Sequence, residues 1–328
     1  MTRTIPGFDQ KGQWYKGNIH CHTTDSDGKL TPMQVVQLYK EKGYHFLAIS
    51  DHHIFSDYRQ TFDSDDFIIL PAIEASAVLY EDETKENLLK VHHIHGILGN
   101  GDMQQNAAAG LFAHLQRYPE KEYFGAWDGA GVAQQIQDDL TAHGCLTIYN
   151  HPVWSRVRED EFIYTKGLTA LEIYNYGTVN ESATGFDSIR WDVMLRNGTH
   201  IFATASDDNH NKEVEDSFGG YLVVKAEELT HEVIINAILC GSYYSSMGPE
   251  IYDWGIKNNI AYVECSPVSR VNFIAGNVVN AGGSVLSETE TDTITKAEFS
   301  LRGNETYIRV ECVDRYGKIA WSNPIFLR

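Results

Sequence analysis

Short apolar runs alternate with amphipathic stretches along the first two thirds of the chain. The alternation of residues 17–22 predicts a strand. Thr31, Pro32 and Gln34 predict a helix start, because Thr caps a helix, Pro suits its first position and Gln completes a capping box. Further strands are predicted at 46–49, 67–70, 91–98, 145–149, 168–174, 201–205 and 221–225, and further helices at 131–143, 184–197 and 230–241. Strands that alternate with helices indicate parallel pairing.

Polar side chains of the kind that bind metal ions stand where these apolar runs end. They are His20 and His22, Asp27, His52, Glu74, the cluster of His92, His93 and His95, His151, and Asp208 with His210. A strand turns residues i and i+2 to the same side, so His20 and His22 can share one site while Cys21 points into the core. Functional residues at the carboxyl ends of many parallel strands are typical of a closed barrel. We therefore expect an α/β barrel that carries a multi-metal centre.

Two segments interrupt this rhythm. Residues 99–130 are rich in Gly, Ala and Gln, and we expect them to form an insertion on the active face that acts as a lid. From about residue 245 the helical pattern stops, and short strands such as 261–265, 271–274 and 307–313 are separated by turn residues. The sequence thus predicts a metallohydrolase barrel over 1–244 and a small all-β sandwich over 245–328.

Composition narrows the range of partners and compartments. A net charge of −19 over 328 residues repels nucleic acid polymers and anionic membranes, so neither is an expected partner. A small anionic substrate stays compatible, because bound divalent cations reverse the local field. Five scattered cysteines without CxxC spacing, the lack of an apolar signal region at the start and the lack of a run of membrane-spanning length favour the cytoplasm. Nothing in the sequence indicates the oligomeric state.

Several positions offer competing candidates for the same role. His52 is preferred over His53, because the residue after Asp51 should enter the barrel mouth, with Asp51 expected to orient an imidazole. His93 and His95 share a face, and His93 is preferred.

Three carboxylates complete the expected centre. Glu74 is the natural bridge between two cations, because a carboxylate has two oxygens to offer. Glu172 could be a ligand, but it is rather expected to hydrogen-bond a ligating histidine, and Asp207 is expected to lie behind the ligands.

With these residues identified, the chain resembles the PHP (polymerase and histidinol phosphatase) superfamily of metal-dependent phosphoesterases. The matching motifs are His20-Cys21-His22-Thr23 with Ser26-Asp27-Gly28, Ile49-Ser50-Asp51-His52, Ile73-Glu74, Asn150-His151-Pro152 and Asp208-Asn209-His210. Downstream, the segments 241–249 and 314–324 resemble the branch that includes the carbaryl hydrolases. The resemblance implies a distorted (β/α)7 barrel that holds up to three divalent metal ions, with zinc, manganese or iron expected and magnesium also compatible.

The resemblance also implies a ligand set and a reaction. The first metal would take His20, His22, Glu74 and Asp208, the second Glu74, His93 and His151, and the third Asp27, His52 and His210. A hydroxide bridging two cations would attack the phosphorus of a small soluble phosphoester. Glu74, Asp208 and His210 are the expected catalytic residues.

The ligand set leaves other activities open. A carboxylester or carbamate hydrolase could use the same centre, because the same nucleophile attacks an acyl carbon. A non-catalytic module whose metals only stabilise the fold is a further alternative, although structural sites are usually closed single-metal cages. Arg156 and Arg158 follow His151-Pro152 and are candidates to grip a phosphate, whereas exposed loop arginines are the plainer interpretation.

Overall fold

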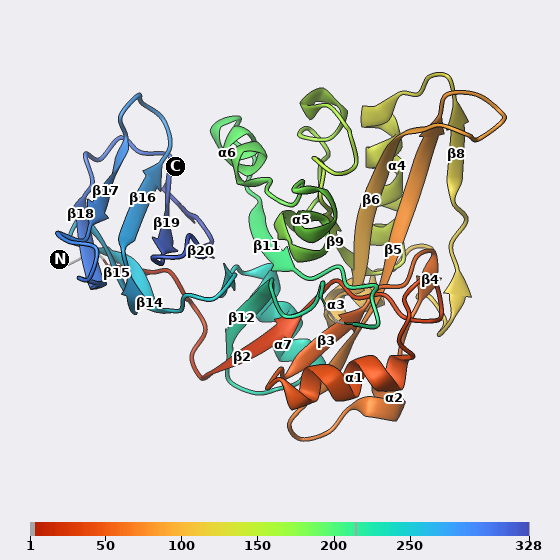
Figure 1. Cartoon of the computed structure of the whole chain (residues 1–328), viewed down its shortest axis with the longest axis horizontal. Coiled ribbons are helices and arrows are strands. Elements are labelled where there is room, and N and C mark those ends of the chain that lie inside the picture. Colours follow the sequence, from red (N-terminus) through yellow and green to blue (C-terminus); the bar gives the residue numbers. More distant parts are fainter. Residues whose placement is uncertain (1–3, 214, 328) are drawn as a thin grey trace.

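The computed structural model describes residues 4–213 and 215–327, and it is a mixed α/β structure built on one large mixed sheet (Figure 1). In spatial order, the first part of this sheet contains β11 (Phe202–Ser206), β10 (Ala170–Asn175), β9 (Cys145–Tyr149), β6 (Leu88–Leu98), β5 (Ile68–Tyr80), β3 (Phe46–Ile49), β2 (Gln13–Asn18) and β12 (Tyr221–Ala226). β3, β9, β10, β11 and β12 each begin and end within two residues of a predicted apolar run, whereas β2 begins and ends four residues early, β6 begins three residues early and β5 is much longer.

The alternation of strands and helices predicted parallel pairing throughout this sheet. The structure corrects that prediction, because several pairs are antiparallel. β5 and β6 form a long antiparallel hairpin, and β6 also pairs antiparallel with β9. β12 pairs antiparallel with β2. The physical reason is the polar stretch 81–87, which turns the chain directly from β5 into β6 without a crossover helix. Glu74 consequently lies inside a strand and not at a strand end.

The predicted closed barrel is also corrected, because the sheet is open at β11. Among the described residues, β11 forms no ladder with β2 or β12, and only Cys21 and Asn209, beyond the strand ends, pair across the gap. Side chains occupy the free edge of β11 instead. Asn323 Oδ1 accepts from Ala203 N at 3.0 Å, and Ser245 Oγ donates to Ala203 O at 2.9 Å. These bonds use the backbone groups that barrel closure would have needed.

The longer helices cover this sheet, and their starts follow from local sequence. α1 (Pro32–Glu41) begins at the cap Thr31, whose side chain forms the expected capping box with Gln34. Thr230 caps α7 (His231–Leu239). The other helical segments are α2 (Arg59–Phe62), α3 (Gly101–Gln105), α4 (Gly129–Ala142), the 3-10 turn η1 (Glu159–Glu161), α5 (Tyr176–Ser182) and α6 (Ser188–Arg196). Apolar faces of α1 and α7 pack on the sheet through residues such as Val35 and Ile234.

None of residues 99–130 lines the cavity described below, and their role as a lid stays a prediction. They contain α3, β7 (Gln116–Arg117) and β8 (Lys121–Phe124). β8 adds a parallel edge strand to the distal half of β5, and β7 pairs with β4 (Ile54–Phe55). The segment therefore extends the sheet away from the cavity that is described below.

The C-terminal strands form two facing sheets (Figure 1). The large sheet continues through β13 (Tyr243–Ser246), β20 (Ile319–Ser322), β19 (Tyr307–Val313), β16 (Arg270–Ala275) and β17 (Gly282–Leu286), with β21 (Ile325–Phe326) beside β19. The second sheet contains β1 (Thr4–Pro6), β14 (Ile251–Lys257), β15 (Ile260–Val268) and β18 (Ile294–Ser300). Apolar residues of both sheets pack in one buried cluster that includes Trp254, Val271 and Phe273.

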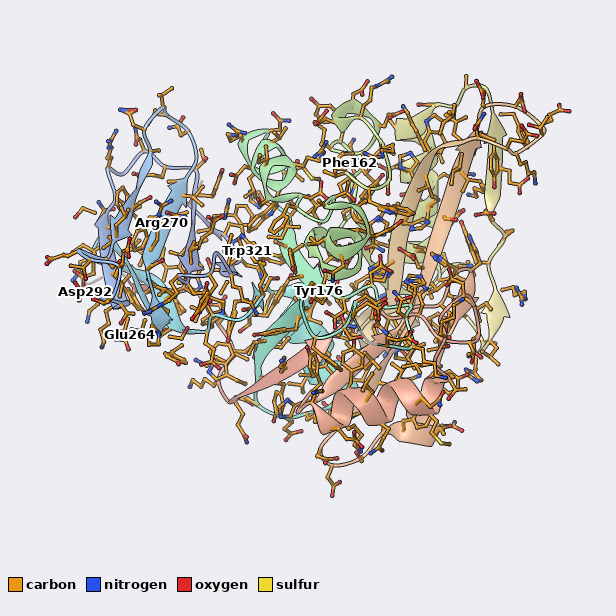
Figure 2. All side chains as sticks on the ribbon, viewed as in Figure 1. Phe162, Tyr176, Glu264, Arg270, Asp292 and Trp321 are labelled. Atoms are coloured by element: carbon orange, nitrogen blue, oxygen red, sulfur yellow. The ribbon has the colours of Figure 1, made fainter. Side chains whose placement is uncertain are left out.

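The part of the molecule built on β2–β12 and the part built on the C-terminal strands are joined through β13 and through buried side chains. β13 pairs with β12 on one side and with β20 on the other, so the predicted boundary at 244/245 falls within a continuous sheet and stays a prediction. Trp321 of β20 is buried against Tyr174 of β10, with ring centroids 5.9 Å apart, and lies between the two parts in Figure 2. None of the helices in the described part of the chain has the length and apolar character needed to cross a membrane.

Candidate metal centre

The His20 and His22 side chains come together with the Asp208 segment through backbone pairing. β2 ends at Asn18, earlier than predicted, and the chain continues extended beside the residues that follow β11. Asp208 N donates to His20 O at 3.0 Å, and His22 N donates to Asn209 O at 3.2 Å. Cys21 is fully buried, as its position between the histidines predicts. Two segments almost two hundred residues apart thus form one wall of a site.

Glu74 lies at the middle of this site and is fully buried. Its two carboxylate oxygens lie within 3.5 Å of five imidazole nitrogens: His20 Nε2 at 3.3 Å, His22 Nε2 at 3.3 Å, His52 Nδ1 at 3.1 Å, His93 Nδ1 at 3.2 Å and His151 Nε2 at 3.5 Å. A single carboxylate that serves this many imidazoles has the arrangement expected of a bridging ligand.

Asp208 provides the second shared carboxylate. Its Oδ1 lies 3.0 Å from His20 Nε2 and 3.1 Å from His22 Nε2, and these two nitrogens are 3.1 Å apart. Two imidazole nitrogens and a carboxylate oxygen therefore converge on one point. Four groups of this kind, whose ligand atoms lie within 4.8 Å of one another, occur among the described residues: His20, His22 and Asp208; His20, Glu74 and His151; His52, Glu74 and His93; and His22, Asp27, His52 and His210.

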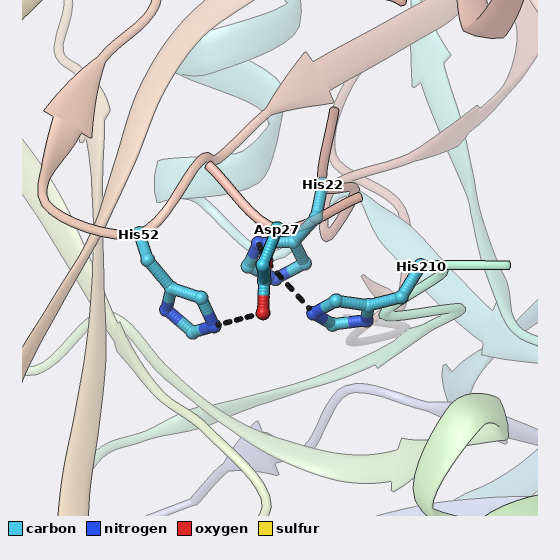
Figure 3. A group of neighbouring side chains, drawn as sticks. All are labelled: His22, Asp27, His52 and His210. Carbon is cyan, nitrogen blue, oxygen red and sulfur yellow. Dashed lines mark ion pairs between the residues drawn. The ribbon is translucent and has the colours of Figure 1, made fainter. Parts of the chain in front are cut away.

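The last group lies at the solvent side. Figure 3 shows the imidazoles of His22, His52 and His210 around the Asp27 carboxylate. Asp27 oxygens lie 3.4 Å from His210 Nε2, 3.7 Å from His22 Nδ1 and 3.8 Å from His52 Nε2. The Asp27 side chain is 55% exposed, whereas Glu74 and Asp208 are buried. The loop that carries Asp27 folds tightly onto His22, because a Cβ at Gly28 would lie 2.5 Å from the His22 carbonyl carbon.

Hydrogen bonds from surrounding residues fix the orientation of the central side chains. His20 Nδ1 contacts Glu172 Oε1 at 2.9 Å, which is the contact predicted for Glu172. Asn150 Nδ2 donates to Glu74 Oε1 at 2.7 Å, and Asn175 Nδ2 donates to Asp208 Oδ2 at 2.9 Å. The other two oxygens, Glu74 Oε2 and Asp208 Oδ1, both face His22 Nε2.

Asp51 has a different role from the predicted one. It holds no imidazole in place, and it accepts hydrogen bonds from Thr23 N and Oγ1, Ser26 Oγ and Ser56 Oγ. It therefore organises the loop that carries Asp27. Asp207 faces away from the cluster and accepts hydrogen bonds from Tyr39 and from the backbone of residues 218–220.

The two histidine ambiguities have clear geometric outcomes. His52 faces Glu74, whereas His53 contacts Ser76 Oγ at 2.8 Å and Glu120 at 3.4 Å. His93 lies 3.2 Å from Glu74, whereas the closest approach of His95 to the same carboxylate is 4.0 Å, because His95 packs edge-on against His20. The structure thus places the preferred candidate of each pair in the cluster.

Two members of the cluster have an unfavourable backbone conformation. His151 has a φ of 24° and Asp208 a φ of 55°, both in a region that residues other than glycine rarely occupy. Such conformations persist only where the surroundings enforce them, and they gather at functional sites. The turn at Asp208 directs its side chain to the side opposite Asp207.

The charged groups of the cluster lie so close together that each strongly shifts the pKa of its neighbours. Burial lowers the pKa of His22, but the neighbouring carboxylates of Asp208 and Glu74 outweigh burial and raise it to about 10. Burial raises the pKa of Glu74, yet His93, His20 and His52 hold it well below its ordinary value. Burial and the positive charge of His22 hold the pKa of His52 well below its ordinary value. The imidazoles and carboxylates of the cluster are therefore strongly coupled electrostatically.

The residues fit bound divalent metal ions. Glu74 Oε2 and His22 Nδ1 are buried and form no hydrogen bond with any described residue, although charged groups lie close to both. Side chains that approach one another without hydrogen-bond geometry are aimed at a common point and not at each other. Imidazole and carboxylate together suit zinc, manganese and iron. The identity and number of metal ions stay predictions.

A cavity of about 300 Å³ opens onto this cluster. Its lining residues are Asp27, His52, Glu74, His93, His151, Trp154, Gly177, Thr178, Glu181, Asp208, His210, Asn211 and Asp216. The structure places neither Arg156 nor Arg158 there. Both are exposed, and Arg158 pairs with Asp160 at 2.9 Å, because the turn after His151-Pro152 carries them away from the cavity. Sequence reasoning missed Trp154 and Glu181, because an indole is no metal ligand and Glu181 lies within a helix and not at the end of an apolar run.

Comparisons with known proteins found similarity only in structure. No protein-family model and no curated sequence matches the chain. A two-domain protein from Bacteroides vulgatus, described as containing a predicted PHP-like metal-dependent phosphoesterase, is 11% identical, with 96% of this chain and 87% of that chain covered and a TM-score of 0.47. A Bifidobacterium adolescentis protein, provisionally assigned as a metal-dependent phosphoesterase, is 14% identical, with 71% and 96% covered and a TM-score of 0.42.

A third solved structure is an amidohydrolase from Chromobacterium violaceum with bound sulfate and no metal. It is 13% identical, with 59% of this chain and 87% of that chain covered and a TM-score of 0.39. At these identities and TM-scores we draw no conclusion about activity from the likeness. The predicted relation to carbaryl hydrolases is represented in none of the three and stays a prediction.

Proposed function

We propose that the chain is a metal-dependent hydrolase that cleaves a small phosphoester in the cavity beside Glu74. One observation carries this proposal: four groups of histidines and carboxylates share members around one cavity. A structural metal site is usually a single closed cage, whereas this cluster is continuous and open to solvent through Asp27 and His210. Divalent metal ions held there would supply Lewis acidity and a nucleophile at neutral pH.

The chain's own residues would hold the centre in a fixed geometry. The contact between Glu172 and His20 Nδ1 turns His20 Nε2 toward the cluster. The amides of Asn150 and Asn175 each bond one carboxylate of the centre and so limit its rotation. We assign the catalytic roles to Glu74, Asp208 and His210, of which His210 is the most accessible, with a side chain that is 30% exposed.

Carboxylester or carbamate hydrolysis is the second candidate, and one observation favours it. Among the described residues that line the cavity there is no lysine and no arginine. A phosphate dianion would therefore depend on the metal ions alone for positive charge, whereas a neutral ester needs no cationic clamp.

Metal analysis and a substrate panel test the proposal. Protein reconstituted with zinc, manganese or iron and freed of excess metal is expected to hold more than one ion per chain. Phosphomonoesters, phosphodiesters, aryl esters and carbamates are then compared by kcat/KM. One ion or none per chain would overturn the multinuclear centre. Carbamates or carboxylesters cleaved far faster than every phosphoester would establish the second candidate.

Two adjacent histidines give a matched control for this experiment. His52→Asn removes an imidazole 3.1 Å from Glu74 and is expected to lower both metal content and activity. His53→Asn makes the same chemical change one residue away, at a φ of 59° that Asn tolerates, and is expected to keep the metal. Equal losses in both variants would show that the effect is not specific to the cluster.

A further inference from the structure

Trp154 and Glu181 form a polar and aromatic wall at the mouth of the cavity. Trp154 follows His151 in the chain, and Glu181 lies on α5. Trp154 Nε1 donates to Glu181 Oε2 at 2.8 Å, which fixes the two side chains relative to each other. The Trp154 ring centroid lies 5.1 Å from that of His151 and 5.8 Å from that of His93. A group bound at this wall would therefore adjoin the proposed reaction centre.

Glu181 differs from the other carboxylates that line the cavity. Glu74, Asp208 and Asp27 face histidines, and Asp216 accepts hydrogen bonds from the backbone of His210 and from Asn211. Glu181 is exposed, and its Oε1 forms no hydrogen bond with any residue that the structure describes. The wall thus keeps an uncompensated negative charge next to an indole ring.

The chemistry of this wall suits an organic cation. An indole ring is the best aromatic partner for a cation, and a carboxylate beside it adds a favourable charge. A second anionic group on the substrate would instead meet Glu181 in a cavity lined by no described lysine or arginine. We propose that Trp154 and Glu181 form a specificity subsite for an alkylammonium group of the substrate. This inference rests on the proposed hydrolase function and deepens it.

Two isosteric phosphomonoesters and a smaller, more anionic one test the subsite. Choline phosphate carries a cationic leaving group, 3,3-dimethylbutyl phosphate is its uncharged isostere, and phosphoglycolate carries an additional anion. The metal-loaded wild-type protein is expected to prefer choline phosphate over the isostere by roughly tenfold in kcat/KM, with phosphoglycolate slowest. Equal rates for the charged and uncharged esters, or a preference for phosphoglycolate, would overturn the inference.

Variants at the wall are expected to change this preference, mainly through KM. Glu181→Gln and Trp154→Leu should each bring the ratio close to unity, and Trp154→Phe should keep part of it because an aromatic face remains. Glu227→Gln is the matched control: it changes the net charge equally at an exposed residue after β12, outside the cavity. An unchanged ratio in both Glu181→Gln and Trp154→Leu would contradict the assignment.

A binding measurement separates this inference from the proposed function. Calorimetric titration of the metal-loaded protein with choline needs no turnover. Binding by the wild type that is weakened in Glu181→Gln and Trp154→Leu, and kept in Glu227→Gln, supports the subsite even if no phosphoester is cleaved. Absence of hydrolysis across the panel would refute the proposed phosphoesterase function alone. Absence of choline binding would refute the subsite.

Discussion

At the scale of single residues, neighbouring aspartates have opposite environments. The left-handed turn at Asp208 directs its carboxylate to His20 and His22. The Asp207 carboxylate accepts hydrogen bonds from Tyr39 and from three backbone N–H groups, and burial raises its pKa to about 6. One carboxylate therefore belongs to the candidate centre, whereas the other holds together the loop around it.

Substitution of each aspartate should separate these roles. Asp208→Ala is expected to lose metal and activity, because it removes a carboxylate shared by two imidazoles. Asp207→Ala is expected to keep most of its metal and to lower the free energy of unfolding by about 1–3 kcal/mol, because buried donors lose their acceptor. Elemental analysis and urea unfolding of both variants measure the two effects. Equal metal loss in both would remove the distinction.

The sequence predicts members of the cluster well where a ligand-type residue also has the spacing that a strand requires. The i, i+2 spacing of His20 and His22 is visible in the sequence, and the structure brings both to Glu74. The contact of Asn150 with Glu74 and that of Trp154 with Glu181 could not be found in the same way, because amides and indoles are common elsewhere and only their three-dimensional neighbours distinguish them. Arg156 is exposed and does not line the cavity, because proximity in sequence to His151 does not fix the direction of a turn, and its proposed contact with a phosphate stays a prediction.

At the scale of elements, the long β5–β6 hairpin accounts for most of the difference between the predicted and observed fold. The apolar run 67–70 predicted a short strand, because Glu74 and Ser76 interrupt the apolar pattern. β5 nevertheless continues to Tyr80, since Asn150 and the surrounding imidazoles compensate the buried Glu74. Site residues therefore hide a strand from sequence patterns, whereas the capping box at Thr31, which depends on local chemistry alone, is confirmed.

The hydrogen bonds of Asn323 and Ser245 to the free edge of β11, which we call the seam, are a second feature that sequence patterns did not show. They lead to a prediction. Asn323 accepts from Ala203 N and donates to the carbonyls of Gly241 and Tyr243. Asn323→Ala should lower the free energy of unfolding by about 1–3 kcal/mol, because it leaves buried backbone groups unpaired. Hydrogen exchange at the Ala203 amide should also accelerate.

An asparagine on the surface provides the control for this seam. Asn87 is exposed and makes a side-chain hydrogen bond to Glu81 at 2.7 Å. Asn87→Ala should leave both the unfolding free energy and the Ala203 exchange rate nearly unchanged. If Asn323→Ala behaved like Asn87→Ala, the seam would not contribute to closing the sheet edge.

At the scale of the whole molecule, the C-terminal sheets are fastened to the part that carries the candidate centre. Trp321 packs on Tyr174, which belongs to the strand that also carries Glu172, the partner of His20. Arg309 of β19 is 1% exposed and donates to Asp192 of α6 at 2.8 Å and to Glu311 at 2.8 Å. The orientation of α6 and β10 thus depends on contacts made by β19 and β20.

Removal of Arg309 should show how much this attachment contributes. Arg309→Met leaves Asp192 and Glu311 without their shared partner and removes the guanidinium stacked 4.4 Å from the Trp191 ring. Breaking a buried pair by removing one partner typically costs about 3–5 kcal/mol, and we expect the lower end, because Asp192 is 28% exposed. Urea unfolding measures the loss, and limited proteolysis should release the C-terminal strands earlier than in the wild type.

Arg270→Met is the control, since Arg270 is exposed on β16 (Figure 2) and should change stability by less than about 0.5 kcal/mol. Comparable destabilisation by both substitutions would show that the buried arginine does not hold the two parts together.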